Sequence, residues 1–216
     1  MMGKYKLLKN PKTDTYLQFK KFILSDDFPW FYMPQTLAPS PAEREGRIKP
    51  FMIKGTERKW NIERKEILLK DKVHAFDHID HPFFSHTFLQ RPILERQYPK
   101  AHSPHLEIVK KTIDEILKHN NIHMDCYFRI NANLDPPIKG HKKNLPHYDH
   151  IWDHTILILY LTDAGGETVA FDNNLKKEFS FDPPEDSIML FKGSNQLHCN
   201  YLPEEKRRVI VIASFI

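Results

Sequence analysis

The chain has 216 residues, of which 40% are hydrophobic and 28% charged, and its formal net charge at pH 7 is +4. This length suits a single domain over residues 1–216, and the composition is that of an ordinary globular protein. The 32 basic and 28 acidic residues nearly balance and form no concentrated basic stripe, so nucleic acid binding is not indicated. No apolar run approaches the roughly 18 residues of a membrane span, so no membrane partner is expected.

Cysteine content and the N-terminal sequence together predict a cytoplasmic setting. Only two cysteines occur, Cys126 and Cys199, which gives no sign of a disulfide framework. The first six residues, MMGKYK, are not followed by an apolar stretch of signal-peptide length. A reducing, intracellular environment is therefore expected.

The first hundred residues or so read as a supporting region of mixed structure. Residues 16–24 have the spacing of a short amphipathic helix, and the prolines at 34, 39 and 41 predict irregular chain after it. Short strands are expected at 51–53 and 67–69. The clearest helix opens at Ser103-Pro104, where serine suits the N-cap and proline the first helical position, and it should end near His119-Asn120.

After this helix the hydrophobic period changes to two, which is typical of strands. Apolar residues 126, 128, 130 and 132 alternate with Tyr127, Arg129, Asn131 and Asn133. Further strands are expected at 155–161, 168–171, 187–191 and 209–214, with a Gly-Gly turn at 165–166. The predicted fold is mainly β with flanking helices: a double-stranded β-helix, a jelly roll of the cupin kind, with its core at about 124–216.

Three His-x-Asp sequences occur, at 78–80, 123–125 and 147–149. Among thirteen histidines such matches arise by chance, and each one alone is more typical of a surface or capping pair. Context favours the third, because it enters the β-rich half, whereas the first lies in an irregular region and the second follows the helix end. A strand carrying His198, the only histidine beyond residue 154, could close a site around it.

The chemistry of such a site follows from strand geometry. Residues i and i+2 of an extended strand point to the same face, so His147 and Asp149 can reach one metal ion together. With His198 they would form a set of two histidines and one carboxylate. This set binds one face of Fe(II) and leaves other positions open for substrates.

Several motifs in the C-terminal half, taken in order, resemble a known family. They are PHYD at 146–149, YLTDAGGET at 160–168, Phe191, His198 and RVIVI at 208–212. Over about residues 124–216, this ordered set resembles the 2-oxoglutarate- and Fe(II)-dependent oxygenases of the prolyl-hydroxylase-like group. Thr162 departs from the pattern, since the family often has asparagine there.

The resemblance implies a dioxygenase that uses Fe(II), 2-oxoglutarate and O2, hydroxylates a substrate, and releases succinate and CO2. His147, Asp149 and His198 would be the iron ligands. Arg208 would bind the distal carboxylate of 2-oxoglutarate, because a guanidinium fork matches a carboxylate with two parallel hydrogen bonds. Arg207 is the rival, since only one of two neighbours on a strand points inward.

Three further residues would complete the co-substrate site that the resemblance implies. Tyr160 matches a tyrosine that donates to the same carboxylate, although a core tyrosine fits equally. Tyr127, on the strand before the metal loop, would add another hydroxyl, and Thr168 would line the pocket. Asn131 and Asn133 either touch a ligand or meet solvent.

Two other classes of function stay open: a metal-free jelly-roll binding or structural protein, and a cupin-type metalloenzyme that does not use 2-oxoglutarate. The substrate is equally open, and a peptidyl side chain, a nucleobase or a small metabolite would each fit a site defined by iron ligands alone. The lysine-containing segment 134–145 is a candidate lid or substrate loop.

Overall fold

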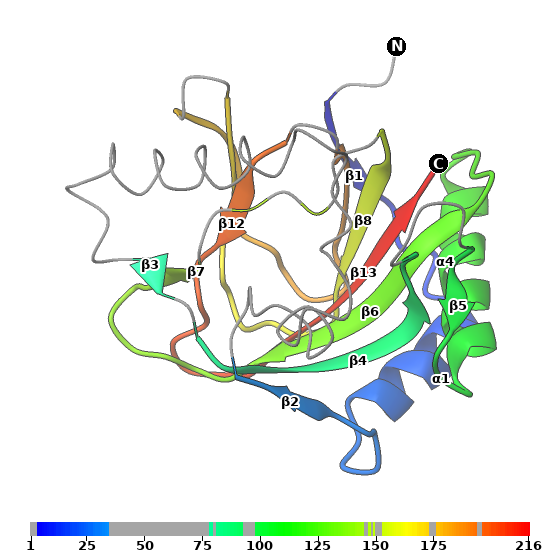
Figure 1. Cartoon of the computed structure of the whole chain (residues 1–216), viewed down its shortest axis with the longest axis horizontal. Helices are drawn as coiled ribbons and strands as arrows, with labels where there is room; N and C mark the ends of the chain where they lie inside the picture. Colours follow the sequence, from blue (N-terminus) through cyan, green and yellow to red (C-terminus); the bar gives the residue numbers. More distant parts are fainter. Residues whose placement is uncertain are drawn as a thin grey trace, which may run out of the picture.

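The computed structural model of the chain describes residues 4–34, 78–79, 81–92, 98–144, 147, 149, 153–172, 176–193 and 196–216. They form a large and a small antiparallel sheet with two helices (Figure 1). The large sheet holds β1 Tyr5–Leu8, β2 Phe31–Met33, β4 Phe83–Gln90, β5 Lys100–Ala101, β6 Tyr127–Asp135, β8 Thr155–Tyr160, β11 Ile188–Lys192 and β13 Arg208–Phe215. The small sheet holds β9 Thr168–Phe171, β10 Lys177–Phe181 and β12 His198–Asn200, and β3 His78–Ile79 pairs in parallel with β7 Lys143–Asn144.

The order of the strands defines the fold. The large sheet runs β1-β11-β8-β13-β6-β4-β2 with β5 beside β4, and the small sheet runs β10-β9-β12. His147 extends the small sheet through an antiparallel bridge to His198. From β6 onward the chain therefore passes repeatedly between the two sheets, as in a double-stranded β-helix. The prediction of a mainly β jelly roll with flanking helices is confirmed.

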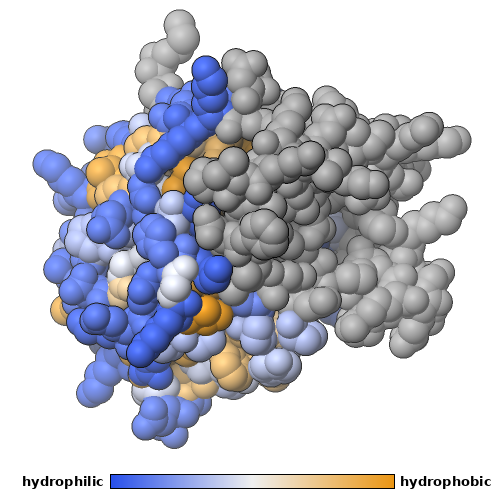
Figure 2. Space-filling view, turned by 90° about the vertical axis from the view of Figure 1, so that its left-hand side faces the viewer, coloured by the Kyte–Doolittle hydropathy of each residue, from blue (hydrophilic) through white to orange (hydrophobic). Residues whose placement is uncertain are grey.

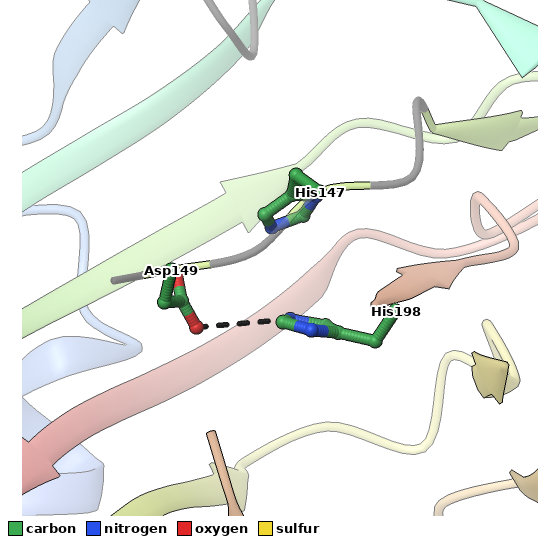
Figure 3. Close-up of side chains that lie close together, drawn as sticks. All are labelled: His147, Asp149 and His198. Atoms are coloured by element: carbon green, nitrogen blue, oxygen red, sulfur yellow. Dashed lines mark ion pairs between the residues drawn. The ribbon is translucent and has the colours of Figure 1, made fainter. Parts of the chain in front are cut away.

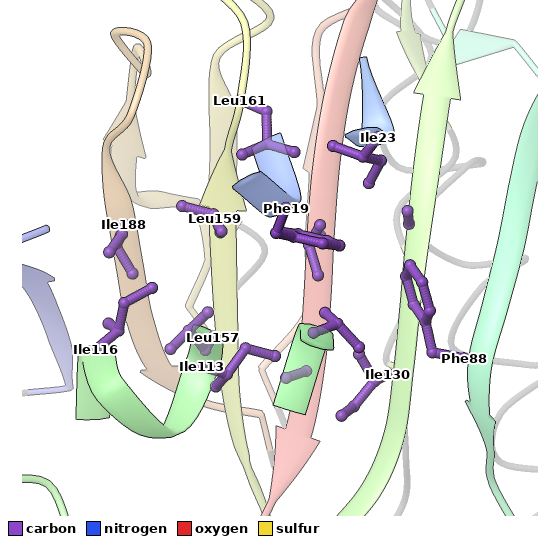
Figure 4. Packing of buried hydrophobic residues seen from close by; sticks show 14 of the residues in the cluster. Phe19, Ile23, Phe88, Ile113, Ile116, Ile130, Leu157, Leu159, Leu161 and Ile188 are labelled. Atoms are coloured by element: carbon purple, nitrogen blue, oxygen red, sulfur yellow. The ribbon is translucent and has the colours of Figure 1, made fainter. Parts of the chain in front are cut away.

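Two helices, α1 Asp14–Ile23 and α4 Leu106–His119, cover the face of the large sheet that points away from the small sheet (Figure 4). Buried apolar side chains of the helices meet those of the strands here; they include Phe19, Ile23, Ile113, Ile116, Phe88, Ile130, Leu157, Leu159 and Ile188. Burying one such side chain contributes roughly 1.5–3 kcal/mol. This cluster, the helix face, therefore supplies much of the stability of the fold.

Both predicted helices exist, but their starts differ from the expectation. The helix expected at 16–24 begins earlier, because the Thr13 hydroxyl accepts a hydrogen bond from the Tyr16 amide at 3.2 Å and caps it. The second helix begins at Leu106, so Ser103 is not its N-cap. Instead, the Ser103 hydroxyl accepts from the His105 amide at 3.1 Å and lies 2.8 Å from the His86 Nε2. The predicted end near His119 is confirmed.

A β-bulge at Phe128 changes which side of the sheet the first side chains of β6 point to. Tyr127 pairs with Phe215 and Arg129 with Ser214, so the pairing register shifts by one residue at Phe128. Tyr127 consequently lies on the helix face together with Ile130 and Ala132. The predicted alternation holds from Arg129 onward and is wrong for Tyr127.

The other predicted strands are present as β8, β9, β11 and β13. The strand β10 is absent from the predicted elements, although Phe179 and Phe181 alternate there with polar residues. The strands expected at 51–53 and 67–69 lie outside the described residues.

The exterior of the described part is mostly hydrophilic on the side that Figure 2 shows, with small separate hydrophobic areas. In the ranges given above, no helix is both long and apolar enough to cross a membrane.

Candidate metal centre

Three side chains from two neighbouring segments converge inside the jelly roll: His147, Asp149 and His198 (Figure 3). Their ligand atoms all lie within 4.8 Å of one another. The backbone holds them there, because the His147 amide donates to the His198 carbonyl at 2.9 Å and the His198 amide donates back at 3.1 Å. The two imidazole rings are 4.7 Å apart between centroids. This group could hold one metal ion.

The surroundings of His198 keep its imidazole in the form that a metal needs. Its Nδ1 donates to the Gln196 carbonyl at 3.1 Å, and since a carbonyl can only accept, the Nε2 lone pair stays available. That Nε2 lies 3.7 Å from the Asp149 Oδ2. Burial, followed by the charge of nearby His147, lowers the pKa of His198 to about 4 against the opposing effect of Asp149. The ring is therefore neutral at pH 7.

The other His-x-Asp sequences differ in setting from this one. His123 and Asp125 form a surface ion pair, with side chains 88% and 70% exposed, so they match the interpretation of a surface pair. Asp80 and the side chain of His78 lie outside the described residues.

A second polar cluster surrounds the buried guanidinium of Arg208. Its Nη1 donates to the Asp135 Oδ2 at 3.3 Å and its Nη2 to the Thr168 Oγ1 at 3.4 Å. Its Nε is buried without a hydrogen-bond partner among the described residues. Arg207 points the other way, is exposed, and donates to the Leu24 carbonyl at 2.9 Å. Of the two rivals, only Arg208 therefore faces the interior.

Tyr160 and Thr168 lie beside Arg208. The Tyr160 hydroxyl is 2.9 Å from the Thr168 Oγ1, and the guanidinium carbon of Arg208 is 5.5 Å from the centre of the Tyr160 ring. Burial raises the pKa of Tyr160, and the positive charge of Arg208 opposes that shift. Since the shift is upward, the phenol keeps its proton at neutral pH and can donate a hydrogen bond.

The predicted Gly-Gly turn closes over this cluster. Gly166 has a φ of +92°, and a Cβ there would lie 2.9 Å from the Tyr201 carbonyl oxygen and 3.0 Å from the Arg208 Cδ. Only glycine satisfies both the left-handed backbone and the close approach.

The metal group and the Arg208 cluster share one interior. His198 pairs with Ala170 and Asn200 with Thr168 across β12 and β9, so His198 and Thr168 lie on the same face of the small sheet. Thr168 in turn contacts Arg208. The three candidate ligands and the buried guanidinium of Arg208 are thus connected through residues on the same face of the small sheet.

Tyr127 does not belong to this interior, so it is a correction to the predicted co-substrate set. Its hydroxyl donates to the Asp114 Oδ1 of α4 at 2.5 Å, and its ring packs in the helix face. The cause is the bulge at Phe128, which reverses the facing of Tyr127.

Sequence reasoning missed the acidic partner of Arg208 and gave Arg129 no role. Asp135 lies 3.3 Å from Arg208 and 3.3 Å from the Nε2 of buried His81. Arg129 lies 3.7 Å from the Asp149 Oδ1. A signal was available: Arg129, Asn131 and Asp135 occupy alternate positions of one strand, and both faces of that strand are covered by the fold.

No protein-family model matches the chain, and no curated protein matches it in sequence. Among solved structures it is similar to an oxidoreductase of the 2OG-Fe(II) oxygenase family from Burkholderia pseudomallei, at 12% identity over 63% of this chain and 67% of that chain, with a TM-score of 0.47. It is also similar to the alpha ketoglutarate dependent epimerase SnoN, at 9% identity over 62% and 61%, with a TM-score of 0.42. A Trichoplax adhaerens prolyl hydroxylase, in complex with a hypoxia inducible factor peptide, gives 11% identity over 96% and 94%, with a TM-score of 0.39. All three TM-scores lie below 0.5, so the case for a function rests on this chain's own residues.

Proposed function

We propose that the chain is a 2-oxoglutarate- and Fe(II)-dependent dioxygenase, in which His147, Asp149 and His198 hold the iron. The observation that carries the proposal is the meeting of these three ligand atoms within 4.8 Å, across a strand bridge. Two imidazoles and one carboxylate are the donor set of non-heme Fe(II) oxygenases. When bound, iron supplies the chemistry by which substrate C–H, O2 and 2-oxoglutarate become substrate C–OH, succinate and CO2.

The protein's own part is to bind and orient. Gln196 fixes the tautomer of His198, and Asp149 lowers the net positive charge of the site. The buried Arg208 offers its guanidinium fork to the far carboxylate of 2-oxoglutarate. Tyr160 and Thr168 supply hydroxyl groups beside it. The buried Arg208 Nε has no hydrogen-bond acceptor among the described residues, and a carboxylate bound here could supply one.

One experiment separates this proposal from its rivals. The melting temperature of the metal-free protein is measured with Mn(II), a redox-inert stand-in for Fe(II), and then with Mn(II) plus 2-oxoglutarate. We expect a rise with the metal and a further rise with 2-oxoglutarate. No rise with metal would favour a metal-free binding protein, and a rise with metal alone would favour a cupin-type enzyme that does not use 2-oxoglutarate.

Turnover is then tested with Fe(II). We expect substrate-independent conversion of 2-oxoglutarate to succinate at a low rate. Adding peptides, nucleotides or small metabolites in separate panels should raise succinate release for the class that contains the substrate. A protein that binds both ligands but forms no succinate under any condition would contradict the proposed reaction.

A further inference from the structure

A row of polar side chains continues from the metal group along the interior of the large sheet. Arg129 and Asn131 lie on the inner face of β6, and Ser214 is the direct cross-strand partner of Arg129 on β13. The side chain of Arg129 is 29% exposed, whereas Asn131 is 0% and Ser214 1% exposed. The row therefore leads from an accessible cation to fully buried neutral groups.

The guanidinium of Arg129 is poorly matched by its present surroundings. Its Nη1 lies 3.7 Å from the Asp149 Oδ1, and among the described residues the Arg129 guanidinium makes no hydrogen bond. The exposed Arg91 is close by and donates to the Asp149 carbonyl at 3.4 Å. Both cations thus contact Asp149, Arg129 at the carboxylate and Arg91 at the backbone carbonyl, and Asp149 is itself a proposed metal ligand.

Two buried oxygens beside Arg129 lack partners. The Ser214 Oγ and the Asn131 Oδ1 have no hydrogen bond within the described part of the protein. A buried polar group left unpaired costs about 1–3 kcal/mol. The Asn131 oxygen can only accept, so a partner for it must bring a donor.

Charge points to the same kind of ligand. Arg208 already has Asp135 as its counter-ion. With a divalent metal on Asp149 and two negative charges from 2-oxoglutarate, the cations Arg129 and Arg91 leave the site with a net positive charge. A further carboxylate group next to Arg129 and Arg91 would pair with this excess positive charge.

We propose that Arg129 and Arg91, with Ser214 and Asn131, bind the carboxylate end of the primary substrate, and that this substrate is a small organic acid with an amino or hydroxy group beside its carboxylate. The carboxylate pairs with Arg129, and the neighbouring donor reaches the Asn131 oxygen. Such a pair of groups belongs to free amino and hydroxy acids, and an acidic side chain within a peptide lacks it. The inference rests on the proposed function, because it takes the metal group as the place of reaction.

The test measures binding to the protein loaded with Mn(II) and saturating 2-oxoglutarate. Melting temperature is followed against concentration for the free amino acids and for hydroxy acids such as L-lactate and L-malate. L-alanine, L-lactate and propionate form a matched set, since propionate lacks the donor. We expect at least one amino or hydroxy acid to stabilise the loaded protein more than its donor-free analogue.

Variants then locate the site. Arg129→Gln should raise the dissociation constant of that acid about 10-fold to 100-fold, the value of a lost charged hydrogen bond. Arg91→Gln, at an exposed position, should raise it less. Arg207→Gln removes the same charge at a surface position away from the interior and should leave it unchanged. Ser214→Ala should weaken binding of the acid. It should not lower the stability of the free protein, because it removes an unpaired hydroxyl.

Three results would overturn the inference. If Mn(II) and 2-oxoglutarate stabilise the protein but no acid adds to this, the proposed function stands and the acid subsite is wrong. If Arg129→Gln abolishes stabilisation by 2-oxoglutarate and Arg208→Gln does not, Arg129 binds the co-substrate instead. If Mn(II) itself has no effect, the proposed function and this inference are both wrong.

Discussion

The two faces of the large sheet have opposite characters, although the same strands build both. On the helix face, Ile130, Leu159 and Val211 pack against α1 and α4. On the interior face, the neighbouring Arg129, Tyr160 and Arg208 point toward the small sheet. Because side chains alternate along a strand, one set of backbone hydrogen bonds fixes both the core and the candidate site. Substitutions on the helix face should therefore change stability, and those on the interior face should change ligand binding.

The largest effect is expected at the metal group. His147→Ala or Asp149→Ala should reduce succinate formation from 2-oxoglutarate by 100-fold or more. Mutating a residue that only hydrogen-bonds to a metal ligand already lowers metal affinity or activity by about 10–100-fold, and removing the ligand itself should cost more. The double variant His123→Ala/Asp125→Asn alters the same motif on the surface and should retain full turnover. Equal rates for the two kinds of variant would contradict the assignment of the ligands.

The second effect concerns the helix face. Leu159→Ala leaves a cavity beneath the helices and should lower the free energy of unfolding by about 2–5 kcal/mol. Urea denaturation measures this loss. The affinity of the folded variant for 2-oxoglutarate should be unchanged, and a large change in affinity would show that the two faces are not separate in effect.

The third effect compares two adjacent arginines. Arg208→Gln should weaken 2-oxoglutarate binding to the Mn(II) protein by about 10-fold to 100-fold, because a buried carboxylate loses a charged partner. Arg207→Gln should have no effect, since that side chain lies outside. Metal binding serves as the check that each variant is folded. The reverse pattern would mean that the facing of β13 is opposite to the one described.

The smallest effects come from two tyrosines on opposite faces. Tyr127→Phe removes the hydrogen bond to Asp114 and should cost about 1 kcal/mol of stability with no change in 2-oxoglutarate affinity. Tyr160→Phe should weaken 2-oxoglutarate binding severalfold instead. Thermal melts with and without 2-oxoglutarate measure both quantities. If Tyr127→Phe lost affinity for 2-oxoglutarate and Tyr160→Phe did not, the assignment of the two tyrosines to opposite faces would be contradicted.

Sequence patterns predicted the parts of this fold that depend on local alternation. The strands at 155–161, 168–171 and 209–214 are present nearly as expected, and the meeting of His147, Asp149 and His198 follows from their spacing and the return of the chain. Alternation also predicted that only one of Arg207 and Arg208 points inward. These inferences succeeded because a strand's period is fixed by its backbone geometry.

The features that sequence missed depend on tertiary structure. The bulge at Phe128 is a register shift against β13, and it moved Tyr127 to the helix face. The Ser103 hydroxyl lies near His86, a residue of a distant strand, and the helix starts after it. The pair of Asp135 and Arg208 joins β6 to β13. Alternation along β6 could have placed Asp135 on the inner face, but no short stretch of sequence shows which residue pairs with it, and none shows the bulge or the contact of Ser103.

The central claim is that three side chains bind one metal ion, and titration of the metal-free protein with Mn(II) tests it most directly. By calorimetry we expect one Mn(II) per chain for the wild type, and loss of that site in His198→Ala, the ligand farthest along the chain from the other two. His123→Ala, on the surface, should bind as the wild type does. Unchanged Mn(II) binding in His198→Ala would contradict the account.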